Sequence, residues 1–193
     1  MSPSRQRLRR LILVGLLSAL YIAMDAIPSP AGGFLKFSGF ILILSGFLCA
    51  PAGGFTVGAI GDLVTYLLRP KGPFFPGFTL TSALTATIPA LVSHKRPNSV
   101  GWIFLGVALG QGITKLLLVP YFTQIAFRVP FQVTLIKDAY QQLFHIPLYT
   151  VGLWAVLARL TTLGVLPDPT DLQDHTSGHN RPGSSSLPEN SGP

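Results

Sequence analysis

The chain has 193 residues, of which 48% are hydrophobic and only 11% are charged, whereas a soluble domain carries about 25% charged residues. This composition predicts a membrane protein, and the length accommodates about six spans of about 20 residues each. The formal charge of +7 comes mostly from an N-terminal block and short loops, so the sequence offers no basic helix face for nucleic acid. The single cysteine, Cys49, excludes a disulfide framework or a thiol metal site within one chain.

Apolar segments bounded by helix breakers predict an all-α integral membrane fold, a compact bundle of six transmembrane helices. The expected helices cover residues 11–27, 38–51, 53–68, 77–93, 100–123 and 138–162. The first apolar stretch lacks a small-x-small cleavage site and further spans follow it, so we expect an uncleaved helix rather than a signal peptide. Between the second and third helices, the sequence APAGG (Ala50–Gly54) predicts a tight turn.

Three regions follow from this pattern: a basic N-terminus at residues 1–10, a membrane domain at 11–162 and a tail at 163–193. The tail is rich in Pro, Gly and Ser and has little to bury, so we expect it to be disordered. The sequence contains no metal-ligand motif, no catalytic motif and no nucleotide-binding loop. We therefore expect neither an enzyme nor a bound cofactor.

The distribution of cations predicts which side of the membrane each end faces. The RQRLRR block and the HKRP loop fall on the same side of a six-span topology, which the positive-inside tendency assigns to the cytoplasm. Both termini are then cytoplasmic. Five other cations converge on the outer side against this tendency, either because short outward loops tolerate them or because they attract an anionic solute: Lys36, Arg69, Lys71, Arg128 and Lys137.

The linker RPKGPFFPGF, which starts at Arg69, predicts a stiff and shaped outward loop. Its three prolines fix their own backbone angles, and its two glycines permit bends closed to other residues. Phe74 and Phe75 cannot both be hidden in so short a connection. They either enter the bilayer interface or form the wall of a cavity on which a flat ligand could stack.

Ionisable residues inside membrane spans are costly and are therefore candidates for function. Asp25, Asp62 and Lys115 occupy such positions. Lys115 could form a structural ion pair with either aspartate, or it could meet a carboxylate of a substrate. On the first helix Gly15, Ala19 and Ala23 recur every fourth residue, a stripe that permits close packing inside the bundle or against a partner protein.

The stretch GAIGDLVTYLLRPKGPFFPGFTLTSALTATIPAL, Gly58 to Leu91, resembles the central region of the substrate-binding S components of energy-coupling-factor (ECF) vitamin transporters, specifically the folate group. The resemblance implies a multi-pass protein of a prokaryotic cell membrane that captures a vitamin from outside. It also implies partners, namely a transmembrane scaffold subunit and two ATPase subunits that supply the energy. In that family small residues on the first helix contact the scaffold, which would be the role of Gly15, Ala19 and Ala23.

The sequence departs from the folate-group pattern at two places. Val119 and Pro120 stand where the family has an Asn-Thr pair, and Lys137, Asp138 and two glutamines stand where it has an Arg and a Lys. These positions are expected to touch the ligand, so the resemblance leaves a different vitamin or precursor open.

Together these features predict an S component that binds folate or a related anionic, ring-containing nutrient without chemistry on it. We expect charge pairing and aromatic stacking from Lys36, Arg69, Lys71, Lys137, Phe74, Phe75 and Phe78. One alternative is a stand-alone secondary transporter or channel that uses Asp62 and Lys115. Another is a membrane assembly factor that transports nothing.

Overall fold

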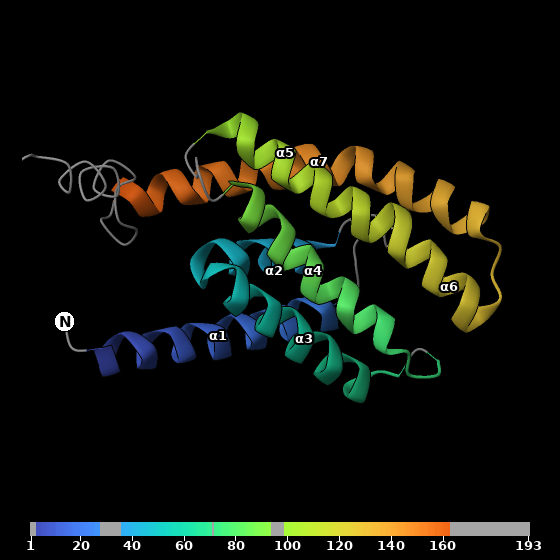
Figure 1. Ribbon diagram of the computed structural model, residues 1–193, viewed down its shortest axis with the longest axis horizontal. Helices are drawn as coiled ribbons and strands as arrows, with labels where there is room; N and C mark the ends of the chain where they lie inside the picture. The colour runs from blue at the N-terminus through green and yellow to red at the C-terminus, as the bar shows by residue number, and fades with distance from the viewer. Residues whose placement is uncertain (1–2, 28–35, 71, 94–98, 163–193) are drawn as a thin grey trace, which may run out of the picture. The chain divides into compact units, whose positions relative to one another are not determined.

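The computed structural model describes residues 3–27, 36–70, 72–93 and 99–162, all of whose regular elements are helical. The elements are α1 (Pro3–Ala26), α2 (Phe37–Leu48), α3 (Ala50–Leu68), α4 (Pro76–Ser93), α5 (Val100–Gln111), η1 (Gly112–Leu118), α6 (Val119–Phe127) and α7 (Phe131–Thr162). The backbone stays helical through Gly112 and Leu118, so α5, η1 and α6 form one continuous helix (Figure 1). The described residues thus form six helices, which confirms the predicted helical bundle.

Two helices begin earlier than hydropathy predicts. The helix α1 starts at Pro3 instead of residue 11, and α7 starts at Phe131 instead of residue 138. The predicted turn at Ala50–Gly54 is wrong as well, because these residues form the first turn of α3 and the chain reverses at Cys49. Pro51 is compatible with this position, since the first helical turn needs no amide donor from it. The tail at residues 163–193 lies outside the described residues.

The helices present apolar side chains outward and polar side chains inward. Large apolar residues such as Leu11 (69% exposed) and Leu143 (69%) face outward, whereas several hydroxyl and amide side chains are buried, including Thr85 and Gln111. In the described part of the chain, the segments Val100–Phe127 and Phe131–Leu160 are long and apolar enough to cross a bilayer. This distribution matches a bundle whose outer surface faces lipid and whose polar side chains are kept inside.

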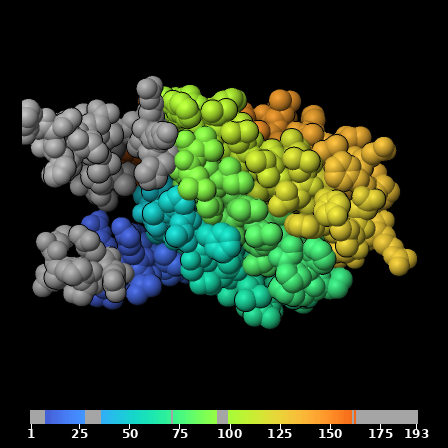
Figure 2. Space-filling view, in the orientation of Figure 1, coloured from blue at the N-terminus to red at the C-terminus, as the bar shows by residue number. Residues whose placement is uncertain are grey.

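Glycines let the central helices approach closely. A Cβ atom on Gly58 of α3 would lie 2.7 Å from the Cα of Ala83 in α4, and one on Gly110 would lie 2.8 Å from the ring of Pro89. On the face seen in Figure 2, side chains of α4 lie between those of α3 and those of the α5–η1–α6 helix. Such contacts replace the hydrophobic driving force that helices lack inside a membrane.

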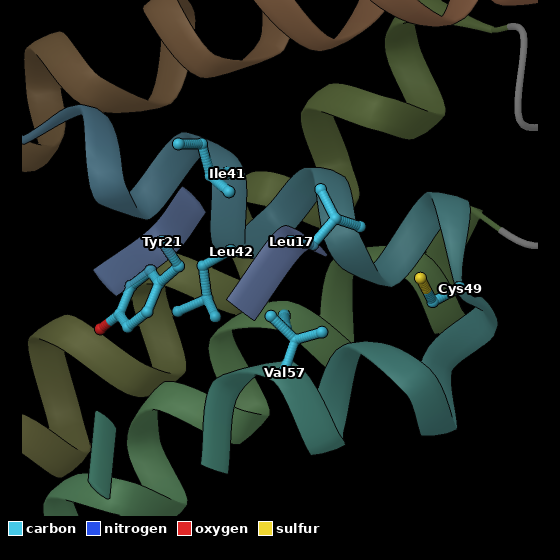
Figure 3. Packing of buried hydrophobic residues seen from close by; sticks show 7 residues of the cluster. Leu17, Tyr21, Ile41, Leu42, Cys49 and Val57 are labelled. Atoms are coloured by element: carbon cyan, nitrogen blue, oxygen red, sulfur yellow. The ribbon is translucent and has the colours of Figure 1, made fainter. Parts of the chain in front are cut away.

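An apolar cluster joins the first three helices. Figure 3 shows Tyr21 of α1, Leu42 of α2 and Val57 of α3 pointing toward a common interior. Leu17 and Ile41 belong to the same cluster, and Val57 is completely buried. The cluster fixes the end of α1 that carries Tyr21 and Asp25 against α2 and α3, and so positions one wall of the site described next.

Candidate functional site

A cavity of about 430 Å³ lies at one end of the bundle. It is lined by the last turns of α1 and α3, the first turns of α2 and α4, and the first half of α7. The end of α5 and residues of η1 and α6 complete the wall. The lining thus belongs to the end where α1 connects to α2, α3 to α4 and α6 to α7, which is the end predicted to face outward.

Each helix contributes one face to the cavity. On α7 the lining residues include Asp138, Gln142, His145 and Tyr149, whose spacing of four, three and four residues places them on a single side of an α-helix. These polar side chains therefore form a continuous strip along the cavity side of α7. The departures from the family pattern point to Asp138 and the glutamines, whereas no sequence motif indicates His145 or Tyr149.

The predicted aromatic residues line the cavity. Phe74, Phe75 and Phe78 are all among its lining residues. The ring centroid of Phe75 lies 5.3 Å from that of Phe122 on α6, and the centroid of Phe78 lies 6.0 Å from that of Phe127. These distances are typical of aromatic packing, so the linker and α6 together form an aromatic wall.

Two of the predicted cations, Lys36 and Arg69, line the cavity, and both are exposed, which places them at its rim. The Nη1 of Arg69 donates a hydrogen bond of 2.6 Å to the carbonyl oxygen of Ala26, which joins the ends of α3 and α1. The main-chain amide of Lys36 donates to Nε2 of His145 at 3.2 Å, and the Tyr149 hydroxyl donates to the Lys36 carbonyl. The start of α2 is thereby held against α7.

The other predicted cations are placed differently. Lys71 lies outside the described residues. Lys137 is exposed on α7 and does not line the cavity, although the adjacent Asp138 does. Arg128 ends α6 in a left-handed conformation, with φ of 54°, and is exposed as well.

The three ionisable residues inside the spans all line the cavity, but they do not pair as considered. Asp62 accepts hydrogen bonds from Thr79 at 2.8 Å and from Ser82 at 3.0 Å, which ties α3 to α4. Asp25 accepts one from Ser38 at 3.2 Å. In the described part of the chain, no ion pair joins Lys115 to either aspartate. Lys115 lines the cavity together with them and with Asp138, whose charge also acts on it.

Lys115 lies in a stretch of wider helix. The main-chain amide of Val119 donates to the carbonyl oxygen of Thr114, five residues earlier, which defines a π turn within Gly112–Leu118. The Thr85 hydroxyl donates to that of Thr114 at 3.0 Å and fixes this stretch to α4. Single π turns inside α-helices are rare and often occur at functional sites. No sequence pattern predicted this one.

The small-residue stripe of α1 lies away from the cavity. Gly15, Ala19 and Ala23 are exposed, and a Cβ atom on Gly15 would meet nothing within 4 Å. Within the described residues, the stripe is therefore not used for packing against other helices. Among the described residues, no group of three or more His, Cys, Asp or Glu side chains could hold a metal ion.

A polar and aromatic cavity inside a bundle with an apolar surface defines a membrane-embedded protein that binds a small molecule. Residues 5–162 match the family model described as ECF-type riboflavin transporter, S component. The chain thus belongs to the family of S components of ECF-type transporters, which confirms the resemblance inferred from the sequence.

Proteins similar to this chain include a curated relative and a solved structure. The folate transporter FolT of Clostridium novyi (strain NT) is 32% identical over 127 residues, which are 63% of this chain and 73% of that protein. The crystal structure of FolT bound with folic acid has a TM-score of 0.65 and 22% sequence identity, and it covers 75% of this chain and 91% of that one. The second similarity supports the fold.

Proposed function

We propose that this chain is the substrate-binding subunit for uptake of folate across a prokaryotic cell membrane. The observation that carries the proposal is the cavity of about 430 Å³ with an aromatic wall and cations at its rim. Its volume falls in the range of about 300–1,000 Å³ that small-molecule sites occupy. The name of the 32% identical relative supports folate, whereas the name of the family model would suggest riboflavin.

The cavity matches the chemistry of folate at two points. Folate carries a flat pteridine ring and a benzoyl ring, for which the wall of Phe74, Phe75 and Phe78 offers stacking surfaces. It also ends in a glutamate with two carboxylates. Lys36 and Arg69 lie at the rim, and the planar guanidinium of Arg69 can bind a carboxylate through two parallel hydrogen bonds.

The remaining predicted cations belong to the same proposal. Lys71 lies in the linker next to Arg69, and Lys137 is adjacent to the lining residue Asp138. We assign both to the approach of the anionic substrate, because charges outside a cleft raise the rate at which an oppositely charged ligand arrives.

The topology that fits this function places the cavity toward the outside and both termini in the cytoplasm. The start of α1 and the end of α4, after which the HKRP sequence follows, do not line the cavity. This agrees with the positive-inside tendency of the basic residues in those two segments. The chain is then a multi-pass protein of the cell membrane with a basic N-terminus, a membrane domain at 11–162 and a cytoplasmic tail. It binds its substrate without chemistry and without a cofactor.

Uptake requires partners in this proposal, namely a transmembrane scaffold subunit and two ATPase subunits. The exposed stripe of Gly15, Ala19 and Ala23 on α1 is the surface we assign to the scaffold. Small side chains let two helices approach closely within a membrane. Asp62 has protein partners for both of its oxygens, so it is better explained as part of the fold than as an ion-coupling residue of a stand-alone transporter.

Two measurements test the proposal. Calorimetric titration of the purified chain in detergent should give saturable binding of folic acid and no binding of riboflavin; the reverse result would overturn the choice of vitamin. Uptake of radiolabelled folate into cells should require the scaffold and ATPase subunits together with this chain. Uptake by the chain alone would instead establish the stand-alone transporter.

A further inference from the structure

Four buried side-chain oxygens in the described part of the chain have no hydrogen-bond partner, and all four belong to residues that line the cavity. They are Thr65 Oγ1, Gln111 Oε1, Asp138 Oδ2 and Gln142 Oε1. Buried polar atoms in native proteins are nearly always hydrogen-bonded. A group of exceptions around one cavity therefore indicates atoms whose partners arrive with the ligand.

Three of these atoms can be described as one acceptor cluster, formed by the oxygens of Gln111, Asp138 and Gln142. Gln111 ends α5 and is 2% exposed. Asp138 and Gln142 lie one turn apart on the cavity face of α7, and Gln142 is 7% exposed. Buried glutamines with unpaired oxygens are costly, so the cluster is not explained by packing alone.

The other carboxylates of the cavity do not need a ligand in the same way. Asp62 accepts from two hydroxyl groups, and Asp25 accepts from Ser38. In its ionised form the Asp138 carboxylate only accepts hydrogen bonds, so its free oxygen then suits a donor whichever way the two amides are turned. The acceptor cluster therefore requires a ligand edge with N–H groups.

Two vitamin head groups differ at such an edge. The pterin ring of folate presents an exocyclic 2-amino group beside a ring N–H, which are three adjacent N–H donors. The corresponding edge of a flavin presents one ring N–H between two carbonyl oxygens. Against the ionised Asp138 carboxylate, the amino group makes hydrogen bonds, while a carbonyl at the same place would set oxygen against oxygen; the amides of Gln111 and Gln142 can turn toward either edge.

We propose that the acceptor cluster of Gln111, Asp138 and Gln142 selects a 2-amino-4-oxopyrimidine edge and rejects the 2,4-dioxo edge. The proposal rests on the proposed function, because it names the part of the vitamin that this cavity distinguishes. It places selection between head groups in α5 and α7, and leaves recognition of the carboxylates to Lys36 and Arg69.

The test uses two ligands that differ in one group: folic acid and its deaminated form, in which oxygen replaces the 2-amino nitrogen. Purified full-length chain should bind the deaminated form more weakly by about tenfold or more, the effect expected when a buried acceptor loses its donor. Asp138→Asn should lose most of this preference, because its amide can donate to the new oxygen. Gln142→Ala should weaken folic acid binding, whereas Gln132→Ala, at an exposed position of α7 away from the cavity, should not.

The outcomes separate this inference from the proposed function. If wild-type chain binds both forms equally well, or if folded Asp138→Asn keeps the full preference, the inference is overturned while folate binding stands. If wild-type chain binds neither form, the proposed function is overturned and the inference with it. Size-exclusion profiles and melting temperatures establish whether each variant is folded. If Asp138→Asn does not fold, the comparison of Gln142→Ala with the control Gln132→Ala serves as the test.

Discussion

Substitution of Gly58 by alanine tests whether the close contact of α3 with α4 holds the bundle together. The new Cβ atom would lie 2.7 Å from the Cα of Ala83 and 2.7 Å from the carbonyl oxygen of Ser82. Both are main-chain atoms, so no side chain can turn aside. The helices must separate by about 1 Å to restore an ordinary carbon contact, and overpacking of this kind costs about 1–3 kcal/mol.

Gly101→Ala is the matched control, because its Cβ atom would meet nothing within 4 Å. Replacing glycine in the middle of a helix by alanine stabilises it by about 0.5–1 kcal/mol. Gly58 lies in the middle of α3 and Gly101 in the first turn of α5, so the difference between the variants is a lower bound on the steric cost. The free energy of unfolding, measured by adding SDS to the protein in detergent micelles, should be about 1–3 kcal/mol lower for Gly58→Ala than for Gly101→Ala. Equal values would refute the close packing of α3 on α4.

Three further predictions concern binding, stability and assembly. Arg69→Gln should weaken folic acid binding by about 10- to 100-fold, the usual effect of losing a charged hydrogen-bonding partner, and calorimetry that finds less than a twofold change would contradict its role at the rim. Asp62→Ala should lower the free energy of unfolding by about 1–3 kcal/mol, because two hydroxyl groups of α4 lose their acceptor. If stability is unchanged and uptake is lost, the result favours an ion-coupling role instead. Gly15→Leu should leave folic acid affinity unchanged and abolish uptake in cells that supply the partner subunits. The control Gly101→Leu should preserve both affinity and uptake. Normal uptake with Gly15→Leu would refute the assignment of this stripe to the scaffold.

The number and order of helices could be predicted from the sequence because apolar runs report which segments cross the membrane. Helix ends could not, because hydropathy reports depth in the bilayer and not the backbone hydrogen bonds that define a helix. The first turns of α7 carry Gln132 and Lys137, which lowers their hydropathy without ending the helix. For the same reason the arginines at the start of α1 were read as a segment before the helix.

The site could be predicted where one linker supplies it and not where helices meet. Arg69, Phe74 and Phe75 are close in sequence, so their shared location follows from the loop. Gln111 of α5 and Tyr149 of α7 are far apart in sequence, and only the folded structure places both in the lining of one cavity. A search for polar residues that recur every three or four positions inside each predicted span could have indicated the cavity side of α7.

The π turn at Gly112–Leu118 sets the rotation of everything that follows it in the same helix. Successive residues of an α-helix differ by about 100° around its axis, so loss of one residue here would turn α6 by that angle while leaving its path through the bilayer almost unchanged. Phe122 and Phe127 would leave the aromatic wall and other side chains of α6 would replace them. A change of chain length by a single residue in this helix could thus give the cavity a different aromatic wall, without any change in the sequences of the other helices.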